Sequence, residues 1–176
     1  MEPSRRSEPV VAVVGRSNVG KSSLINRLLG RTVARVGKTP GKTRGVYFYE
    51  TEEGFRLVDL PGAGFARVSR DERERWAGLV EELFRSGRVS LALRLVDGRV
   101  PASPADRELT AYLEARGVPA IAVATKWDRL GAGERAAARR RLEETHGAVL
   151  AVSARSGEGM DALRREIRRR VKEVEE

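Results

Sequence analysis

The sequence predicts a three-layer α/β fold, in which a mixed, mostly parallel sheet of six strands is flanked by about five helices. Three observations lead to this prediction. Short apolar runs rich in β-branched residues alternate with helical patterns. Glycines follow the helical patterns, as is typical of helix ends. One pair of apolar runs is separated by a turn too short to hold a crossover helix.

The elements can be assigned in order from the N-terminus. Residues 1–8 are polar and are expected to form a flexible arm. The apolar runs predict strands over 10–14, 46–50, 55–59, 89–96, 120–124 and 149–152. The helical patterns predict helices over 21–29, 70–86, 104–116, 134–145 and 160–174, with stops at Gly30, Gly87, Gly117 and Gly147.

The turn over residues 51–54 joins its two strands so closely that they should pair antiparallel. The other strands alternate with helices, which predicts parallel pairing and ligand binding at the carboxyl ends of the strands.

Composition limits the classes of protein that remain. The 176 residues suit one domain over 9–176, expected to be a monomer. With no cysteine, neither disulfides nor thiolate metal sites are possible. No apolar stretch resembles an export signal or a membrane span, so we expect a cytoplasmic protein.

The net charge of +9 is concentrated near the N-terminus. Residues 1–50 carry ten basic and three acidic side chains, against thirteen of each in 51–130 and eleven and nine in 131–176. This excess is larger than one small phosphate-bearing ligand would need. We therefore hypothesise a second polyanionic partner, RNA. The surplus cations are Arg5, Arg6, Arg27, Arg31, Arg35, Lys38 and Arg44.

A phosphate-binding loop is predicted between the first strand and the first helix. The motif is formed by Gly15, Arg16, Ser17, Asn18, Val19, Gly20, Lys21 and Ser22. Glycines let backbone N–H groups close around phosphates, Lys21 supplies a charge to the β- and γ-phosphates, and Ser22 can hold Mg²⁺. The sequence therefore predicts a nucleoside triphosphate site.

Three further motifs follow predicted strands. The first consists of Asp59, Leu60, Pro61 and Gly62, in which Asp59 can hold Mg²⁺ opposite Ser22 and the Gly62 N–H can sense the γ-phosphate. The second consists of Thr125, Lys126, Trp127 and Asp128. The third consists of Val152, Ser153 and Ala154, whose backbone is placed to bind the guanine carbonyl.

Asp128 indicates which purine is bound. Its carboxylate can accept two hydrogen bonds from the ring N–H and the exocyclic amine of guanine, whereas adenine presents the wrong pattern. The stem of Lys126 would lie along the purine ring. The expected ligands are therefore GTP and GDP with Mg²⁺.

Together these motifs resemble the nucleotide-binding domain of translation-factor-type (TRAFAC) P-loop GTPases with a Ras-like fold. More closely, the segments 15–26 (GRSNVGKSSLIN), 38–43 (KTPGKT), 59–66 (DLPGAGFA) and 125–128 (TKWD) are similar to the EngB family of bacterial GTPases, along nearly the whole chain. The resemblance implies GTP hydrolysis, a role in assembling the large ribosomal subunit, and a link to cell division and septation.

The resemblance also implies a switch segment formed by Gly41, Lys42, Thr43, Arg44 and Gly45. Thr43 would ligate Mg²⁺ when the γ-phosphate is present, and Thr39 is the competing candidate. With Lys21, Asn18 and Gly62, Thr43 completes the candidate catalytic residues. Ser22, Thr43 and Asp59 are the candidate metal ligands.

Two positions bear on the hydrolysis rate. Ala63 stands where many small GTPases have a water-orienting Gln and where family members have a larger apolar or aromatic residue. Without such a side chain, intrinsic hydrolysis should be slow, on the order of 10⁻⁴ to 10⁻² s⁻¹. Asn18 matches the P-loop asparagine of potassium-activated relatives, which makes K⁺ a candidate cofactor.

Several residues have a simpler interpretation beside a functional one. The basic runs on the last two helices can be solvated faces or rRNA contacts; they comprise Arg139 to Arg141, Arg164, Arg165, Arg168, Arg169 and Lys172. Trp76, Leu79, Val80 and Leu83 are expected to face the core, and His146 to cap a helix. Asp97, Gly98 and Arg99 resemble a strand-ending turn at the ligand-binding edge, and their role stays open.

Three functions compete at this point. The first is a GTPase coupled to an assembling large ribosomal subunit, and the second is a GTP-gated ribosome- or RNA-binding module with negligible hydrolysis. The third is an ATP-using P-loop enzyme such as a small-molecule kinase, against which Asp128 already argues.

Overall fold

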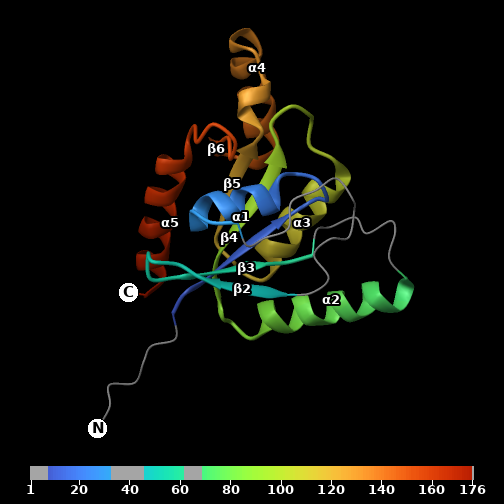
Figure 1. Cartoon of the computed structure of the whole chain (residues 1–176). Helices are drawn as coiled ribbons and strands as arrows, with labels where there is room; N and C mark the ends of the chain where they lie inside the picture. The colour runs from blue at the N-terminus through green and yellow to red at the C-terminus, as the bar shows by residue number, and fades with distance from the viewer. Residues whose placement is uncertain (1–7, 33–45, 62–68, 176) are drawn as a thin grey trace.

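The computed structural model describes residues 8–32, 46–61 and 69–175. Within these residues one sheet has the strand order β2-β3-β1-β4-β5-β6 (Figure 1). The strands are β1 (Val10–Gly15), β2 (Tyr47–Glu50), β3 (Arg56–Asp59), β4 (Val89–Asp97), β5 (Ala120–Thr125) and β6 (Val149–Ala151). The helices are α1 (Lys21–Leu29), α2 (Arg70–Arg85), α3 (Pro104–Ala115), the 3₁₀ helix η1 (Trp127–Arg129), α4 (Ala132–His146) and α5 (Met160–Glu175).

This architecture confirms the predicted fold. Every pair of neighbouring strands is parallel except β2 and β3, which form the expected antiparallel hairpin. The predicted bounds differ from the observed ones by one or two residues at most. Helix α4, for example, begins at Ala132 because the Glu134 side chain accepts a hydrogen bond of 2.8 Å from the backbone N–H of Gly131.

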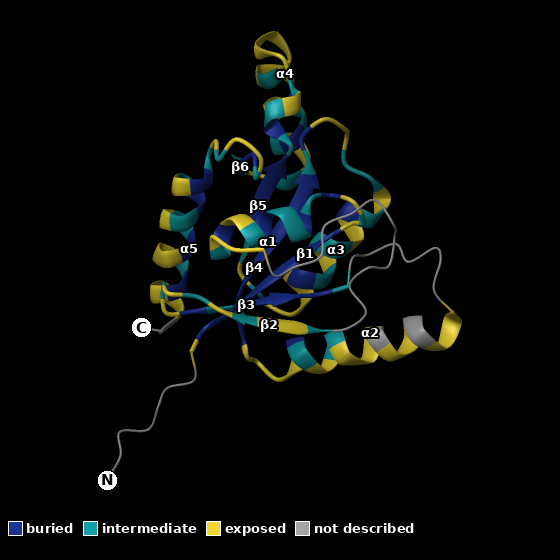
Figure 2. Ribbon diagram, viewed as in Figure 1, coloured by how far each residue is buried: buried dark blue, intermediate teal, exposed yellow. Residues whose placement is uncertain are grey.

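Strand β1 divides the core between the two faces of the sheet. Val11 and Val13 pack with α1 and α5, whereas Val10, Ala12 and Val14 pack with α2 and α3. This alternation follows from the two-residue period of a strand, and it explains why the whole of β1 is apolar. A third cluster joins α4 to the β5 and β6 side of the sheet through Leu142 and Trp127. Figure 2 shows the buried strands between the helices.

Helix α2 departs from the expected pattern. Leu79, predicted to face the core, is 44% exposed, while Val80 and Leu83 are partly buried against the cluster that contains Phe84. Among the described side chains of α2, the apolar residues that pack against the sheet therefore lie in its C-terminal half. The side chain of Trp76 lies outside the described residues.

Two arginines of α5 bind the β2–β3 turn, and one of them also binds the end of α1. Arg164 and Arg168 both form ion pairs with Glu53 in the β2–β3 turn, at 2.8 Å for Arg168. Arg164 also donates hydrogen bonds to the carbonyl oxygens of Arg27, at 3.0 Å, and Leu28, at 2.8 Å, in α1. One guanidinium thus joins α5, α1 and the hairpin. In the described part of the chain, no helix is both long and apolar enough to cross a bilayer.

Candidate nucleotide-binding site

The loop between β1 and α1 has the geometry of a phosphate cradle. Asn18 (φ 62°) and Gly20 (φ 100°) have left-handed backbone conformations, and the Val19 N–H donates to the Arg16 carbonyl at 3.3 Å. A Cβ on Gly15 would lie 2.9 Å from Val19 Cγ1 and 3.0 Å from the Leu95 carbonyl oxygen, so this position needs glycine. The loop leads directly into the N-terminus of α1, where unpaired backbone N–H groups favour an anion.

Lys21 and Asp59 meet in the interior. Both are buried, at 8% and 3% exposure, and the Lys21 ammonium forms an ion pair with the Asp59 carboxylate. The sequence predicted these residues as separate phosphate and metal ligands. Their contact places the end of β3 directly beside the first residue of α1 and confirms that the two motifs adjoin.

The residues near this pair fit a divalent cation. The Asp59 carboxylate already faces a positive charge, because the Lys21 ammonium contacts it. Ser22, the next residue of α1, supplies a hydroxyl from the same turn. A hard cation such as Mg²⁺ prefers oxygen ligands of this kind.

A cavity lies at the other end of the site from Lys21 and Asp59. It has a volume of about 340 Å³ and lies between the start of α1 and the loops after β5 and β6. It is lined by Gly20, Ser23, Leu24, Asn26, Thr125, Lys126, Asp128, Arg129, Val152, Ala154 and Arg155. The predicted base-binding residues Lys126, Asp128, Val152 and Ala154 are therefore brought together here.

Backbone hydrogen bonds hold the walls of this cavity. The Val152 N–H donates to Ala124 O at 2.8 Å, and the Trp127 N–H donates to Val152 O at 3.2 Å. Ser153 is fully buried, and its Oγ accepts a hydrogen bond of 3.0 Å from the Ser156 N–H. Ser153 therefore supports the loop, while Ala154 faces the cavity. Trp127 is also buried, at 4% exposure, and packs beneath the site.

The phosphate and base ends are linked by Thr125. Its hydroxyl oxygen lies 2.6 Å from the Val19 carbonyl oxygen and 3.1 Å from that of Val96, so the hydroxyl can donate to either. Lys126, with a left-handed backbone (φ 58°), donates from its ammonium to the Asn18 carbonyl. The loop after β5 is thus fastened to the P-loop at two points.

Some predicted residues cannot be placed. Gly41, Lys42, Thr43, Arg44, Gly45 and Gly62 lie outside the described residues, together with Thr39 and Ala63. Leu60 is described and is buried, at 1% exposure, in the cluster that contains Val58. Its role is to pack the start of the loop that follows β3.

Other residues near the site were missed from the sequence or left open. Arg129 and Arg155 line the 340 Å³ cavity, and no motif pointed to them; Asn26, at the end of the segment 15–26, lines it as well but was given no role. Asp97 and Arg99 line a smaller cavity of about 240 Å³ beside the P-loop, with Arg16, Asp106 and Lys126. The only feature of the sequence that pointed to a role for Asp97 in the site was its position at the carboxyl end of a strand.

The basic runs are largely used inside the protein. Arg141 donates to Gly98 O at 3.2 Å, and Arg139 donates to Val149 O at 3.1 Å. Arg169 pairs with Glu166 and Glu173, and Arg170 also pairs with Glu166. Hydrogen bonds from Arg169, then from Arg170, outweigh the effect of burial and lower the pKa of Glu166 to about 2. In the described part of the chain, Arg140, Arg165 and Lys172 form no ion pair and remain available to a polyanion.

His146 does not cap its helix. Its ring lies against the guanidinium of Arg94, which also donates to the His146 carbonyl oxygen at 3.3 Å. Burial, followed by the charge of Arg94, lowers the pKa of His146. Arg94, from β4, therefore binds the end of α4, and the imidazole serves as its acceptor.

Comparison with known proteins shows the class to which the chain belongs. A family model described as 50S ribosome-binding GTPase matches residues 10–126. The crystal structure of Aquifex aeolicus Era bound to GDP.AlF4⁻ is 25% identical, with a TM-score of 0.78, over 91% of this chain and 56% of that one. With a phosphate loop and a base cavity on one edge of the sheet, these matches define the chain as a P-loop GTPase, an enzyme that binds GTP and hydrolyses it.

The family follows from sequence relatives. The chain is 41% identical over 162 residues to the probable GTP-binding protein EngB of Thermotoga maritima, covering 87% of this chain and 82% of that protein. It is 38% identical over 159 residues to that of Aquifex aeolicus, covering 88% and 87%. A crystal structure of a probable GTP-binding protein EngB matches with a TM-score of 0.77 at 27% identity, over 93% and 99%. The chain belongs to the EngB family of GTP-binding proteins.

Proposed function

We propose that this GTPase is a Mg²⁺-dependent, nucleotide-gated switch in the assembly of the large ribosomal subunit. The observation that carries the proposal is the match of residues 10–126 to the family model of 50S ribosome-binding GTPases. The site geometry supports the switch, because one edge of the sheet combines a phosphate loop with a base cavity. The exposed cations Arg140, Arg165 and Lys172 offer contacts for rRNA.

Each part of the site has a proposed role. The P-loop amides and Lys21 bind the phosphates, which requires the Lys21 ammonium to turn from Asp59 toward the ligand. Asp128 selects guanine in the 340 Å³ cavity, and the stem of Lys126 lies along the base. Ser22, Thr43 and Asp59 would hold Mg²⁺, which when bound supplies positive charge to the β- and γ-phosphates. The Gly62 N–H senses the γ-phosphate.

Hydrolysis by the isolated chain is proposed to be slow, because Ala63 has no group that can orient water. A partner or a cation would then accelerate hydrolysis, and Asn18 is the candidate ligand for K⁺. The test replaces KCl with NaCl at constant ionic strength and measures GTP turnover. Unchanged turnover would remove K⁺ from the mechanism.

The ribosomal role is tested by cosedimentation. Purified large subunits should carry the protein into the pellet with a non-hydrolysable GTP analogue and release it with GDP. Equal pelleting in both states would contradict a nucleotide-gated switch. Small subunits at the same concentration provide the matched control.

The second candidate is a GTP-gated binding module whose own hydrolysis is negligible, which Ala63 favours. Single-turnover hydrolysis with and without large subunits separates the two functions. Acceleration by subunits supports the coupled GTPase, whereas a constant rate with nucleotide-dependent binding supports the module.

The cellular part of the proposal is that the protein is a cytoplasmic monomer without membrane attachment, and that its loss disturbs division and septation. Depletion in the source organism should give incomplete large subunits before any division defect. Sedimentation equilibrium of the purified protein tests the monomer.

A further inference from the structure

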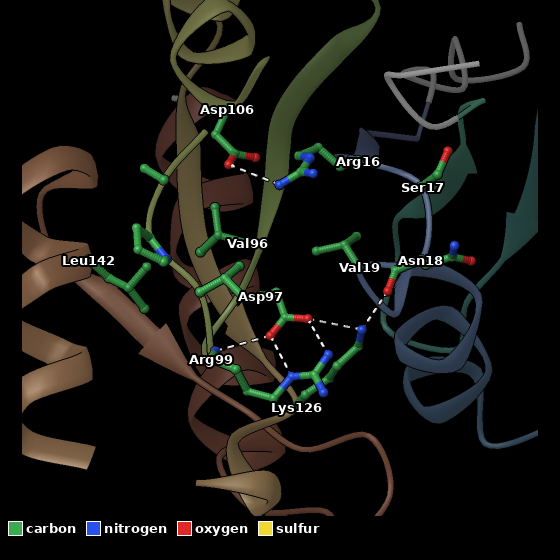
Figure 3. Close-up of a pocket in the computed structure, with 13 residues that line it drawn as sticks. Arg16, Ser17, Asn18, Val19, Val96, Asp97, Arg99, Asp106, Lys126 and Leu142 are labelled. Carbon is green, nitrogen blue, oxygen red and sulfur yellow. Dashed lines mark hydrogen bonds and ion pairs between the residues drawn. The ribbon is translucent and has the colours of Figure 1, made fainter. Parts of the chain in front are cut away.

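The turn after β4 approaches the base-binding loop closely. The Gly98 N–H donates to Thr125 O at 3.0 Å, and a Cβ on Gly98 would lie 2.9 Å from both Thr125 O and Trp127 Cε3. Only glycine allows this approach. The neighbouring residue Asp97 is thereby placed beside Lys126 (Figure 3).

The Asp97 carboxylate accepts hydrogen bonds from two residues, Arg99 and Lys126. Arg99 donates to it from its backbone N–H at 3.0 Å, from Nε at 2.9 Å and from Nη2 at 2.7 Å. Lys126 Nζ donates to Asp97 Oδ2 at 3.0 Å. Although burial raises the pKa of Asp97, the hydrogen bonds from Arg99 and Lys126 outweigh it and hold the pKa well below its ordinary value. The carboxylate is therefore charged throughout the physiological range.

The Lys126 ammonium donates to two acceptors, one on a side chain and one on the backbone. One is Asp97 Oδ2 and the other is the P-loop carbonyl of Asn18. Lys126 lines both the 240 Å³ cavity, which contains Asp97, and the 340 Å³ cavity, which contains Asp128. Its side chain is thus a wall shared by the two cavities, and its charged end binds Asp97, which lines the 240 Å³ cavity.

We propose that Asp97 is a positioning residue of the guanine site, which acts by holding the Lys126 ammonium against the P-loop so that the lysine stem stays extended along the base. This inference rests on the proposed role of Lys126 in base binding. Arg99 supports Asp97 and is not among the described residues that line the 340 Å³ cavity. A simpler alternative is that Asp97 only stabilises its own turn.

A double-mutant cycle of Asp97→Asn and Lys126→Met distinguishes the two. Asparagine keeps the shape of the side chain and can still accept the hydrogen bond from the Arg99 backbone. The measurement is GDP affinity by calorimetry, with thermal unfolding of each variant as the check on folding. Glu74→Gln, which changes the net charge equally on the exposed face of α2, is the control and should bind as the wild type does.

In the presence of Lys126, Asp97→Asn should weaken GDP binding about tenfold, the size expected for a lost charge-assisted hydrogen bond. In the Lys126→Met background the same substitution should change affinity less than about twofold, because its target is gone. Equal effects in both backgrounds, or no effect in either, would overturn the inference. If Asp97→Asn does not fold, Asp97→Glu, which keeps the charge but displaces it by one methylene, is used in the same cycle.

The cycle also separates failure of the inference from failure of the proposed site. If Lys126→Met binds GDP as tightly as the wild type, the role of Lys126 itself is wrong, and the inference falls with it. If Lys126→Met binds weakly but Asp97→Asn does not, only the role of Asp97 is wrong.

Discussion

The hydroxyl of Thr125 lies 2.6 Å from the carbonyl oxygen of Val19, although the two residues are 106 positions apart in the chain. Thr125 ends β5 and Val19 belongs to the P-loop. The contact sets the spacing between the base cavity and the phosphate loop. The predicted base-binding and phosphate-binding segments are therefore joined by a direct contact.

Asp128 should determine base preference. Replacing Asp128 with Asn removes the acceptor pair for guanine, so GDP affinity should fall about 10- to 100-fold. Xanthosine diphosphate, which has a carbonyl where guanine has its amine, should bind the variant better than GDP because Asn can donate to that carbonyl. Calorimetry with both nucleotides provides the measurement.

The matched control is Asp161→Asn, an exposed carboxylate on α5. It should leave both affinities unchanged. An Asp128→Asn variant that still prefers GDP by the wild-type factor would contradict the assignment of the base cavity.

Lys21 should affect stability as well as binding. Lys21→Met removes the ammonium from a buried carboxylate, so the free energy of unfolding without nucleotide should fall by about 3 kcal/mol. Adding Asp59→Asn removes the buried charge and should restore part of that loss, while GTP binding stays absent in both variants. Urea unfolding and nucleotide titration measure the two effects separately. A double variant less stable than Lys21→Met would show that the ion pair is not the cause.

Gly98 should tolerate no side chain. A methyl group there would contact the Thr125 carbonyl and the Trp127 indole, so Gly98→Ala should reduce the free energy of unfolding by about 1 to 3 kcal/mol. Gly78→Ala is the matched control, since a Cβ at this helical position meets nothing within 4 Å. That variant should be more stable than the wild type by about 0.5 to 1 kcal/mol. Equal effects of the two substitutions would contradict the close packing at Gly98.

His146, the only histidine, should make stability depend on pH. Burial, then the charge of Arg94, lowers its pKa from the ordinary 6.5 in the folded protein, with Arg107 acting in the same direction and Asp106 opposing it. Below pH 6.5 the unfolded chain takes up a proton that the folded chain refuses. Stability is therefore complete above pH 6.5 and decreases as the pH falls toward the lowered folded pKa, by at most about 1.4 kcal/mol per pH unit.

His146→Gln should abolish this part of the pH dependence. Urea unfolding of both proteins at pH 7.5, 6.5 and 5.5 gives the comparison. Parallel stability profiles over this interval would mean that the ring is protonated equally in both states.

The sequence was sufficient for most of the fold because β1 and its P-loop are locally consistent. An apolar strand, a turn with left-handed residues at Asn18 and Gly20, and a helix start follow one another, so periodicity and turn chemistry agree. Leu79 was predicted wrongly: the face of α2 that places Val80 and Leu83 against the core leaves Leu79 on the exposed side.

The site was predictable where a motif has local chemistry and unpredictable where it depends on tertiary contacts. Asp128 and Val152 were found because each follows a strand. The ion pair of Lys21 with Asp59 and the contact of Asp97 with Lys126 join residues 38 and 29 positions apart, and only the fold reveals them. His146 was assigned to helix capping because no local signal indicated Arg94.

The bonds from Arg164 and Arg168 to Glu53 bear on the order in which a newly synthesised chain can fold. The last 16-residue helix supplies Leu163, Ile167 and Val171 to the cluster that covers β1, and it also fastens the β2–β3 turn. Until α5 has been synthesised and has docked, that apolar surface stays uncovered. Productive folding therefore requires α5, and a chain that stops short of Met160 would expose a surface prone to aggregation.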